Sequence, residues 1–198
     1  MKSQEWRHEL GECVRYLFRS PEMEHFYSIK MTTQRARIYL LQLSLYVRQR
    51  RNFWPQVAAN CPEFDVKQRI LSHEYEELVE DEHSKHGHLD LIFRQGKEVG
   101  LSLDEIVNAE ALPTTTAAIY AWFWIARNRP WQEAIAASTI AEWTNDDRLL
   151  GEPGGGNCSR LYKIWKNDLN LNDTQMPNFA AHAKADVKHS DMFIDVLE

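Results

Sequence analysis

The stretch Phe179-Ala-Ala-His-Ala-Lys-Ala-Asp-Val-Lys-His-Ser-Asp-Met-Phe-Ile-Asp-Val-Leu197 combines strong helix formers with metal-competent side chains. His182, Asp186 and His189 are spaced i, i+4 and i+7. On an α-helix this spacing places all three side chains on one stripe about 10 Å long. Pro177 suits the start of such a helix, and the alanines favour its continuation. A polar surface stripe would show the same spacing, so the rest of the sequence has to decide.

Helical periodicity extends through nearly the whole chain, with apolar residues at steps of three and four. It predicts a short capped helix from Ser102 and longer helices at about 4–19, 33–60, 65–98, 115–127, 132–145, 159–167 and 177–197. Thr32 is the predicted cap of the 33–60 helix, Pro55 is expected to kink or divide it, and Gly87 can interrupt the 65–98 region. No stretch predicts a strand. The sequence therefore predicts one all-α domain over residues 1–198, a bundle of about seven helices.

The composition is that of a soluble globular protein, with 43% hydrophobic and 26% charged residues. A formal charge of −6 argues against nucleic acid or an anionic membrane as the main partner. No apolar run approaches the roughly 20 residues of a membrane span, and the N-terminus lacks the apolar core of a signal peptide. The three cysteines form no CxxC pair, which favours a reducing cytoplasm and directs metal chemistry toward nitrogen and oxygen ligands.

The acidic segment Glu77-Leu-Val-Glu-Asp-Glu-His-Ser-Lys-His-Gly-His88 is the natural counterpart of the C-terminal stripe. If one helix continues through Gly87, Asp81 and His88 lie two turns apart on one face, as His182 and His189 do. Glu76 has the same i, i+7 spacing to His83, and Glu80 forms an ExxH pair with His83, so spacing alone leaves both sets open. A densely charged, solvated face is the competing interpretation.

Glu142 is a third candidate ligand because it lies in an alanine-rich helix whose circumference is mostly apolar. A buried carboxylate requires a metal, a cation or solvent. The small residues Ser138 and Thr139 would permit close approach of another helix. Facing helices of a bundle that project such side chains inward can hold a metal pair, and open nitrogen and oxygen ligand sets suit iron, with manganese as the competitor.

The pattern resembles the heme-oxygenase-like diiron oxidases, within the superfamily of heme oxygenases and thiaminase II (TenA-like) proteins. The residues that carry the resemblance occur in the family's order, namely Glu24-His-Phe-Tyr27, the helix from Gln34 to Pro55, His88-Leu-Asp-Leu, Gly100-Leu-Ser and the motif His182-x3-Asp186-x2-His189. It implies a seven-helix, homodimeric fold that binds two Fe(II) ions per chain and uses dioxygen to oxidise a small molecule resembling an amino or fatty acid. The implied ligands are Asp81, His88, Glu142, His182, Asp186 and His189.

One departure from the family concerns the first carboxylate, which is usually Glu and here corresponds to Asp81. Glu77, Glu80 or Glu82 can take its place. Two other branches of the superfamily are alternatives, a cofactorless oxidase of the type that makes pyrroloquinoline quinone and a TenA-like hydrolase. The hydrolase requires an internal nucleophilic cysteine, and the cofactorless oxidase leaves the HxxxDxxH stripe unexplained. A non-catalytic helical binding protein is the alternative from a different class.

Overall fold

The computed structural model describes residues 3–80, 84–150, 155–192 and 194–197, and only the backbone of residues 3, 183–188 and 195. All regular structure within these ranges is helical, which confirms the predicted all-α class. The described residues divide into two compact units, Thr32–Ala134 and the combination of Met1–Met31 with Ile135–Glu198. Each unit is described separately below.

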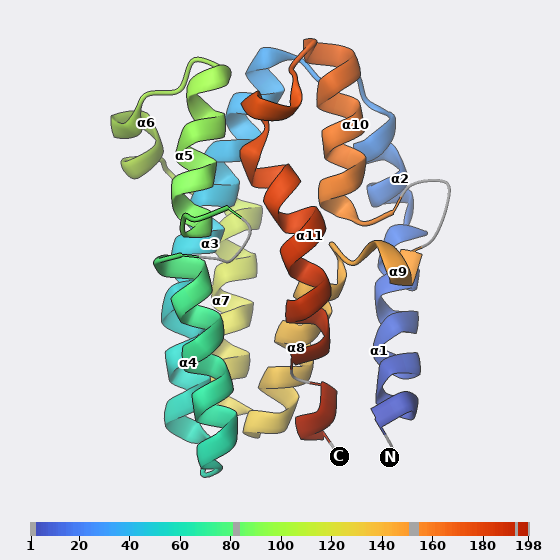
Figure 1. The fold of residues 1–198 in the computed structure, drawn as a ribbon, viewed down its shortest axis with the longest axis vertical. Helices are drawn as coiled ribbons and strands as arrows, with labels where there is room; N and C mark the ends of the chain where they lie inside the picture. The colour runs from blue at the N-terminus through green and yellow to red at the C-terminus, as the bar shows by residue number, and fades with distance from the viewer. Residues whose placement is uncertain (1–2, 81–83, 151–154, 193, 198) are drawn as a thin grey trace. The chain divides into compact units, whose positions relative to one another are not determined.

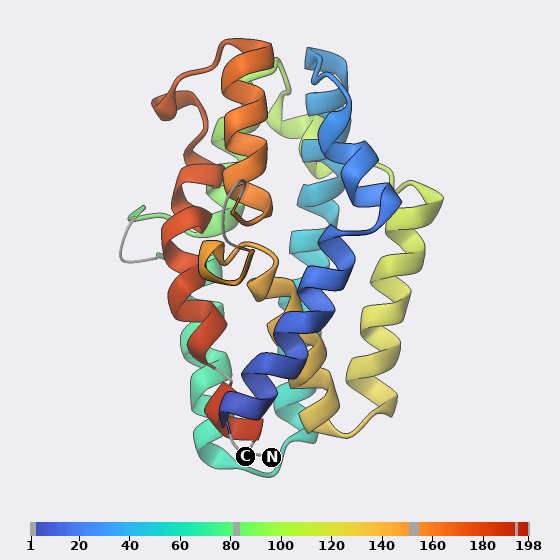
Figure 2. The ribbon, with the colours of Figure 1, turned by 90° about the vertical axis from the view of Figure 1, so that its right-hand side faces the viewer.

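The unit Thr32–Ala134 is built on α3 (Thr33–Asn60), which packs against α4 (Phe64–Leu78), α5 (His88–Glu98), α6 (Leu103–Val107) and α7 (Pro113–Asn128). Figures 1 and 2 show α3 running beside α4 and α7. The side chain of Thr32 caps α3 by accepting a hydrogen bond from the Arg35 amide. Pro55 neither ends nor divides this helix, contrary to the prediction of a division. Its ring is exposed, so the interrupted hydrogen bond lies on the solvent side.

The other unit combines an N-terminal and a C-terminal part of the chain. The N-terminal part contains α1 (Ser3–Phe18) and α2 (Pro21–Ser28). The C-terminal part contains α9 (Asp147–Leu150), α10 (Asn157–Leu169), the 3₁₀ segment η1 (Asp173–Gln175), α11 (Pro177–Met192) and η2 (Ile194–Leu197). Helix α8 (Trp131–Trp143) crosses the boundary between the two units. Within this unit α10 packs against α11, and α1 packs against η2, so both chain ends lie together (Figure 1). The buried Trp165 and Phe179 rings form an edge-to-face pair between α10 and α11, with centroids 5.0 Å apart.

The described helices outnumber the predicted seven for two reasons. Short helices such as α2 and α9 fall below the length at which sequence periodicity is readable. The predicted 65–98 region is also two helices, since α4 ends at Leu78 and α5 begins at His88. Gly87 explains the break, because a Cβ at this position would lie 2.6 Å from the backbone carbonyl of Leu78. A glycine is therefore required where the chain returns against the end of α4.

Candidate metal centre

Helix α4 carries a buried His–Glu group near its C-terminal end. His73, Glu74 and Glu77 are all buried, and the guanidinium of Arg51 on α3 lies between the two carboxylates. Arg51 Nη1 is 3.1 Å from Glu74 Oε1 and 2.9 Å from Glu77 Oε2. Because His73 and Glu77 are four residues apart on one helix, their side chains share a face.

His88 joins this group from the first position of α5. Its Nδ1 is 2.8 Å from Glu77 Oε1, and its side chain is completely buried. The close approach of Gly87 to Leu78 brings the start of α5 against the end of α4, next to Glu77. The turn between the two helices therefore unites Glu77 and His88, which lie on different helices.

Glu77 is a carboxylate on which burial and charge act in opposite directions. Burial alone would raise its pKa, but the positive charges of His88 and Arg51 more than offset this, as does the hydrogen bond from His88. The pKa of Glu77 therefore lies well below its usual range. The side chain is an anion in a site closed to water, which is the state in which a carboxylate binds a metal ion.

The His73 ring is oriented by a carboxylate and an aromatic ring. Its Nδ1 is 3.2 Å from Glu74 Oε1, and its centroid is 5.2 Å from that of Trp54. When Nδ1 carries the proton and donates it to Glu74, the lone pair lies on Nε2, which is 3.9 Å from Glu77 Oε1. Metal-binding histidines commonly have such a carboxylate behind them.

A second His–Glu group lies in the other unit, where α8 and α11 contribute Glu142 and His189. Both side chains are buried, and a carboxylate oxygen of Glu142 lies within 4.8 Å of a ring nitrogen of His189. The two helices are joined next to these residues, since the indole Nε1 of Trp143 donates a 2.6 Å hydrogen bond to the carbonyl of Ser190. The neighbouring Ser138 and Thr139 are fully buried small residues, as their predicted role in close helix approach requires.

The remaining predicted ligands are His182, Asp186 and Asp81. His182 is half-buried on α11, and its Nδ1 donates a 2.8 Å hydrogen bond to the Asn178 carbonyl, which leaves the lone pair on Nε2. The side chain of Asp186 and the whole of Asp81 lie outside the described residues. The condition under which Asp81 and His88 would share one helical stripe is not met, because α4 ends at Leu78 and α5 begins at His88.

Of the buried or half-buried residues above, the sequence predicted His88, Glu142, His182 and His189 as ligands and Glu77 as an alternative, but it predicted no role for His73 and Glu74. A signal for the missed residues existed, since His73-x3-Glu77 has the i, i+4 spacing of a ligand pair on one helix face. The pair lies just before the densely charged segment from Glu77 to His88, in which one helix was expected to continue through Gly87.

The donor sets of both units fit a first-row divalent ion. Ligand atoms bound to one ion at about 2.0–2.2 Å lie roughly 3 Å apart when they occupy adjacent positions. The 2.8 Å between Glu77 Oε1 and His88 Nδ1 matches that spacing once a metal ion has replaced the Nδ1 proton. The 3.9 Å between Glu77 Oε1 and His73 Nε2 is within reach of small side-chain rotations. Imidazole nitrogen with carboxylate oxygen, and no thiolate, is the set that iron and manganese accept.

Comparison with known proteins gives two kinds of sequence relationship. The model of a family described as iron-containing redox enzymes matches residues 37–198. A segment of 87 residues, 41% of this chain, is 33% identical to the pyrroloquinoline-quinone synthase of Klebsiella pneumoniae. The same values hold for the pyrroloquinoline-quinone synthase of Acinetobacter baylyi. The matched segment spans 32% of the length of each of these relatives.

A solved structure supplies the comparison of folds. A domain of unknown function with a heme oxygenase-like fold, from Shewanella denitrificans, matches 100% of this chain and 78% of its own, with a TM-score of 0.76. The two sequences are 17% identical, so the likeness extends to the fold alone. It confirms the predicted heme oxygenase-like class.

Proposed function

Because this chain belongs to the family of iron-containing redox enzymes, we propose that it is a non-heme iron oxidase. Its substrates would be dioxygen and a small organic molecule resembling an amino or fatty acid. The observation that carries the proposal is the buried carboxylate of Glu77, which lies beside His73 and His88 and is ionised. The three free cysteines are consistent with the reducing cytoplasm that we infer as its location.

The proposed ligands are the predicted residues with one substitution. Glu77 takes the role that the resemblance gives to Asp81, and it acts with His88, Glu142, His182, Asp186 and His189. His73 is a further candidate. We propose two Fe(II) ions per chain, with Mn(II) as the alternative. Bound Fe(II) would supply the electrons with which dioxygen is reduced.

The surrounding residues hold these ligands in a defined state. Arg51 offsets the charge of Glu74 and Glu77, and Glu74 fixes the ring of His73. The full burial of His73 and His88 excludes bulk water from their side of the site. Such exclusion protects a reactive centre from side reactions.

Metal content tests the assignment of Glu77. The purified chain would be loaded anaerobically with Fe(II), freed of excess metal and analysed, and we expect about two irons per chain. Glu77→Gln and His88→Ala should each remove at least one of them. Glu80→Gln is the matched control, since it alters an exposed carboxylate three residues from Glu77. An unchanged iron content in Glu77→Gln, together with a loss of iron in Glu80→Gln, would contradict the assignment.

The similarity to pyrroloquinoline-quinone synthases favours a second candidate function, an oxidase that requires no metal. The two candidates differ in how oxygen consumption depends on iron. With a panel of small amino and fatty acids, an iron oxidase consumes oxygen only after iron loading. Consumption that survives a chelator, and that persists in His88→Ala, would support the second candidate.

A further inference from the structure

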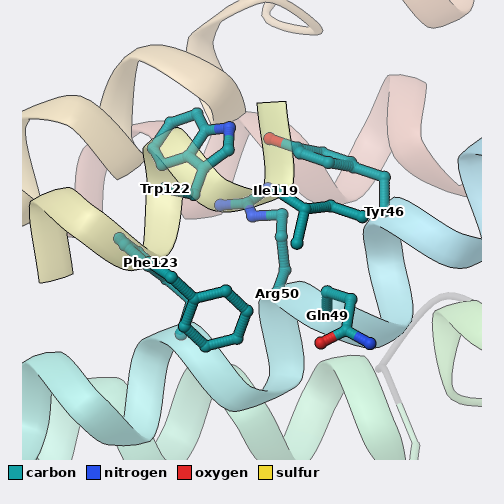
Figure 3. Close-up of a pocket in the computed structure, with 7 residues that line it drawn as sticks. Tyr46, Gln49, Arg50, Ile119, Trp122 and Phe123 are labelled. Atoms are coloured by element: carbon teal, nitrogen blue, oxygen red, sulfur yellow. The ribbon is translucent and has the colours of Figure 1, made fainter. Parts of the chain in front are cut away.

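Helix α7 has two apolar stripes, and the one that faces α3 is filled. Ile119, Trp122 and Phe123 project toward α3, where Trp122 lies against Tyr46 and Arg50 (Figure 3). Ala126 continues this stripe one turn further and is buried. The cavity left among these side chains is about 10 Å³, room for a single water molecule. This face of α7 is therefore fully used within the chain.

The second stripe consists of Ala117, Tyr120, Ala121 and Trp124 and is exposed. It has the same i, i+3, i+4, i+7 spacing as the inward stripe. Tyr120 is 70% exposed and Trp124 is 57% exposed, and no charged residue occurs from Pro113 to Ala126. Apolar residues on opposite faces of a helix usually indicate that both faces are buried.

We propose that this outward stripe, Ala117–Trp124, is the surface on which a second copy of the chain docks, with the two α7 helices antiparallel. Each chain carries a formal charge of −6, so two copies repel generally, whereas an uncharged stripe imposes no repulsion. A two-fold axis pairs a surface with itself, so the stripe has to be self-complementary.

The charges at the two ends of α7 select the antiparallel arrangement. Glu110 is exposed just before the helix, and Arg127 is exposed at its end. Antiparallel pairing about Tyr120 and Ala121 brings Glu110 of each copy to the Arg127 end of the other, whereas parallel pairing would bring like charges together. The segment with Glu110 is fixed in position, since Gln42 donates to the Glu110 carbonyl and accepts from the Leu112 amide.

The shape of the surface agrees with this arrangement. A groove of about 310 Å³ runs between α3 and the first half of α7, lined by Tyr39, Gln42, Leu43, Tyr46, Thr114, Thr115 and Ala118. In the antiparallel pair Trp124 of the second copy lies opposite Ala117, beside this groove. Small side chains at Ala117 and Ala121 allow the helices to approach closely, and a large aromatic side chain seated in a groove is the usual anchor of an interface.

Solution mass and its response to substitution test the docking surface. By sedimentation or light scattering we expect wild-type protein at about twice the chain mass of 23.2 kDa. Trp124→Glu and Tyr120→Glu should weaken dimerisation by about tenfold or more. Leu71→Glu, at a 66% exposed apolar position on α4, is the matched control and should leave it unchanged. A monomeric wild type, or dissociation by Leu71→Glu but not by Trp124→Glu, would overturn the proposal.

A charge-swap cycle tests the antiparallel geometry. Glu110→Arg and Arg127→Glu should each weaken dimerisation, because each places like charges together at both ends of the helix pair. The double variant restores opposite charges and should recover most of the lost affinity. Two single effects that simply add in the double variant would overturn the geometry. All these side chains are exposed, so circular dichroism and iron content should match the wild type, which separates this test from that of the metal centre.

Discussion

Two imidazoles in this protein each have Nδ1 against an oxygen that helps to orient the ring. The contact of His73 is the Glu74 carboxylate at 3.2 Å, and that of His182 is the Asn178 carbonyl at 2.8 Å. In both cases Nδ1 faces the oxygen, and a proton on Nδ1 leaves Nε2 as the donor nitrogen. A histidine held in this way loses little rotamer freedom when it binds a metal ion.

At residue scale, Asp191 gives a pH-dependent prediction. Its carboxylate accepts hydrogen bonds from Arg7 at 2.7 Å and from Arg148 at 3.1 Å. Partial burial raises its pKa, but the two arginines lower it by more, so the pKa lies below its usual value. A carboxyl group with a lowered folded-state pKa stabilises the fold above its unfolded-state pKa, and this contribution disappears as the pH falls through the folded-state pKa.

We therefore expect Asp191→Asn to lower the free energy of unfolding at pH 7 by less than about 1 kcal/mol, since the side chain is 45% exposed. The difference from wild type should shrink as the pH falls from 7 to 3, because the carboxyl of the unfolded chain becomes protonated in this range. Urea denaturation at both pH values measures it, with Glu80→Gln as a control carboxylate that is exposed. A difference that persists unchanged at pH 3 would show that the Asp191 charge is not its cause.

At the scale of elements, the junction of α4 and α5 is the feature that assembles the His–Glu group. Helix α4 delivers Glu77 one residue before it ends, and α5 begins at His88. The two are adjacent because Gly87 lies directly against the Leu78 carbonyl. A continuous helix would have placed Glu77 and His88 about 16 Å apart.

Gly87→Ala should consequently both destabilise the protein and impair the site. Its Cβ would lie 2.6 Å from backbone atoms that cannot rotate away, and we expect a loss of about 1–3 kcal/mol in unfolding free energy. Denaturant unfolding and iron content are the measurements. Gly11→Ala is the matched control in α1, where a Cβ meets only the mobile end of Arg15, and alanine there should be neutral or stabilising. Equal effects of the two substitutions would contradict this account.

At the scale of the whole molecule, each compact unit carries its own His–Glu group. One holds His73, Glu77 and His88, and the other holds Glu142 and His189. Buried carboxylates and imidazoles are costly for a fold unless they are paired or bind a metal ion. Iron bound by either group, as proposed above, would stabilise the unit that supplies the ligands.

Iron should therefore raise the thermal stability of the protein. A ligand present at about 100 times its Kd stabilises the native state by about 2.7 kcal/mol, which corresponds to roughly 5–10 °C for a chain of this size. Anaerobic thermal unfolding with Fe(II) measures the shift, and Mg(II) at the same concentration is the control. The double variant Glu77→Gln/His88→Ala should show no shift. An equal shift with Mg(II) would mean that the stabilisation does not come from these ligands.

No helix of the described residues is long and apolar enough to cross a membrane. Helix α7 is apolar on two faces, but its 16 residues are fewer than the roughly 20 that a membrane span requires.

The sequence by itself determined the all-α class, most helix positions, and His88, Glu142, His182 and His189 as candidate ligands. These follow from local physics, because helical periodicity, capping by Thr32 and the spacing of residues on one helix depend on near neighbours. Only the tertiary structure decided that Glu77 meets His88, that Glu74 orients His73, and that Trp124 is exposed. Each depends on how the chain turns between helices, and a close backbone approach such as that of Gly87 to Leu78 leaves no periodic trace in the sequence.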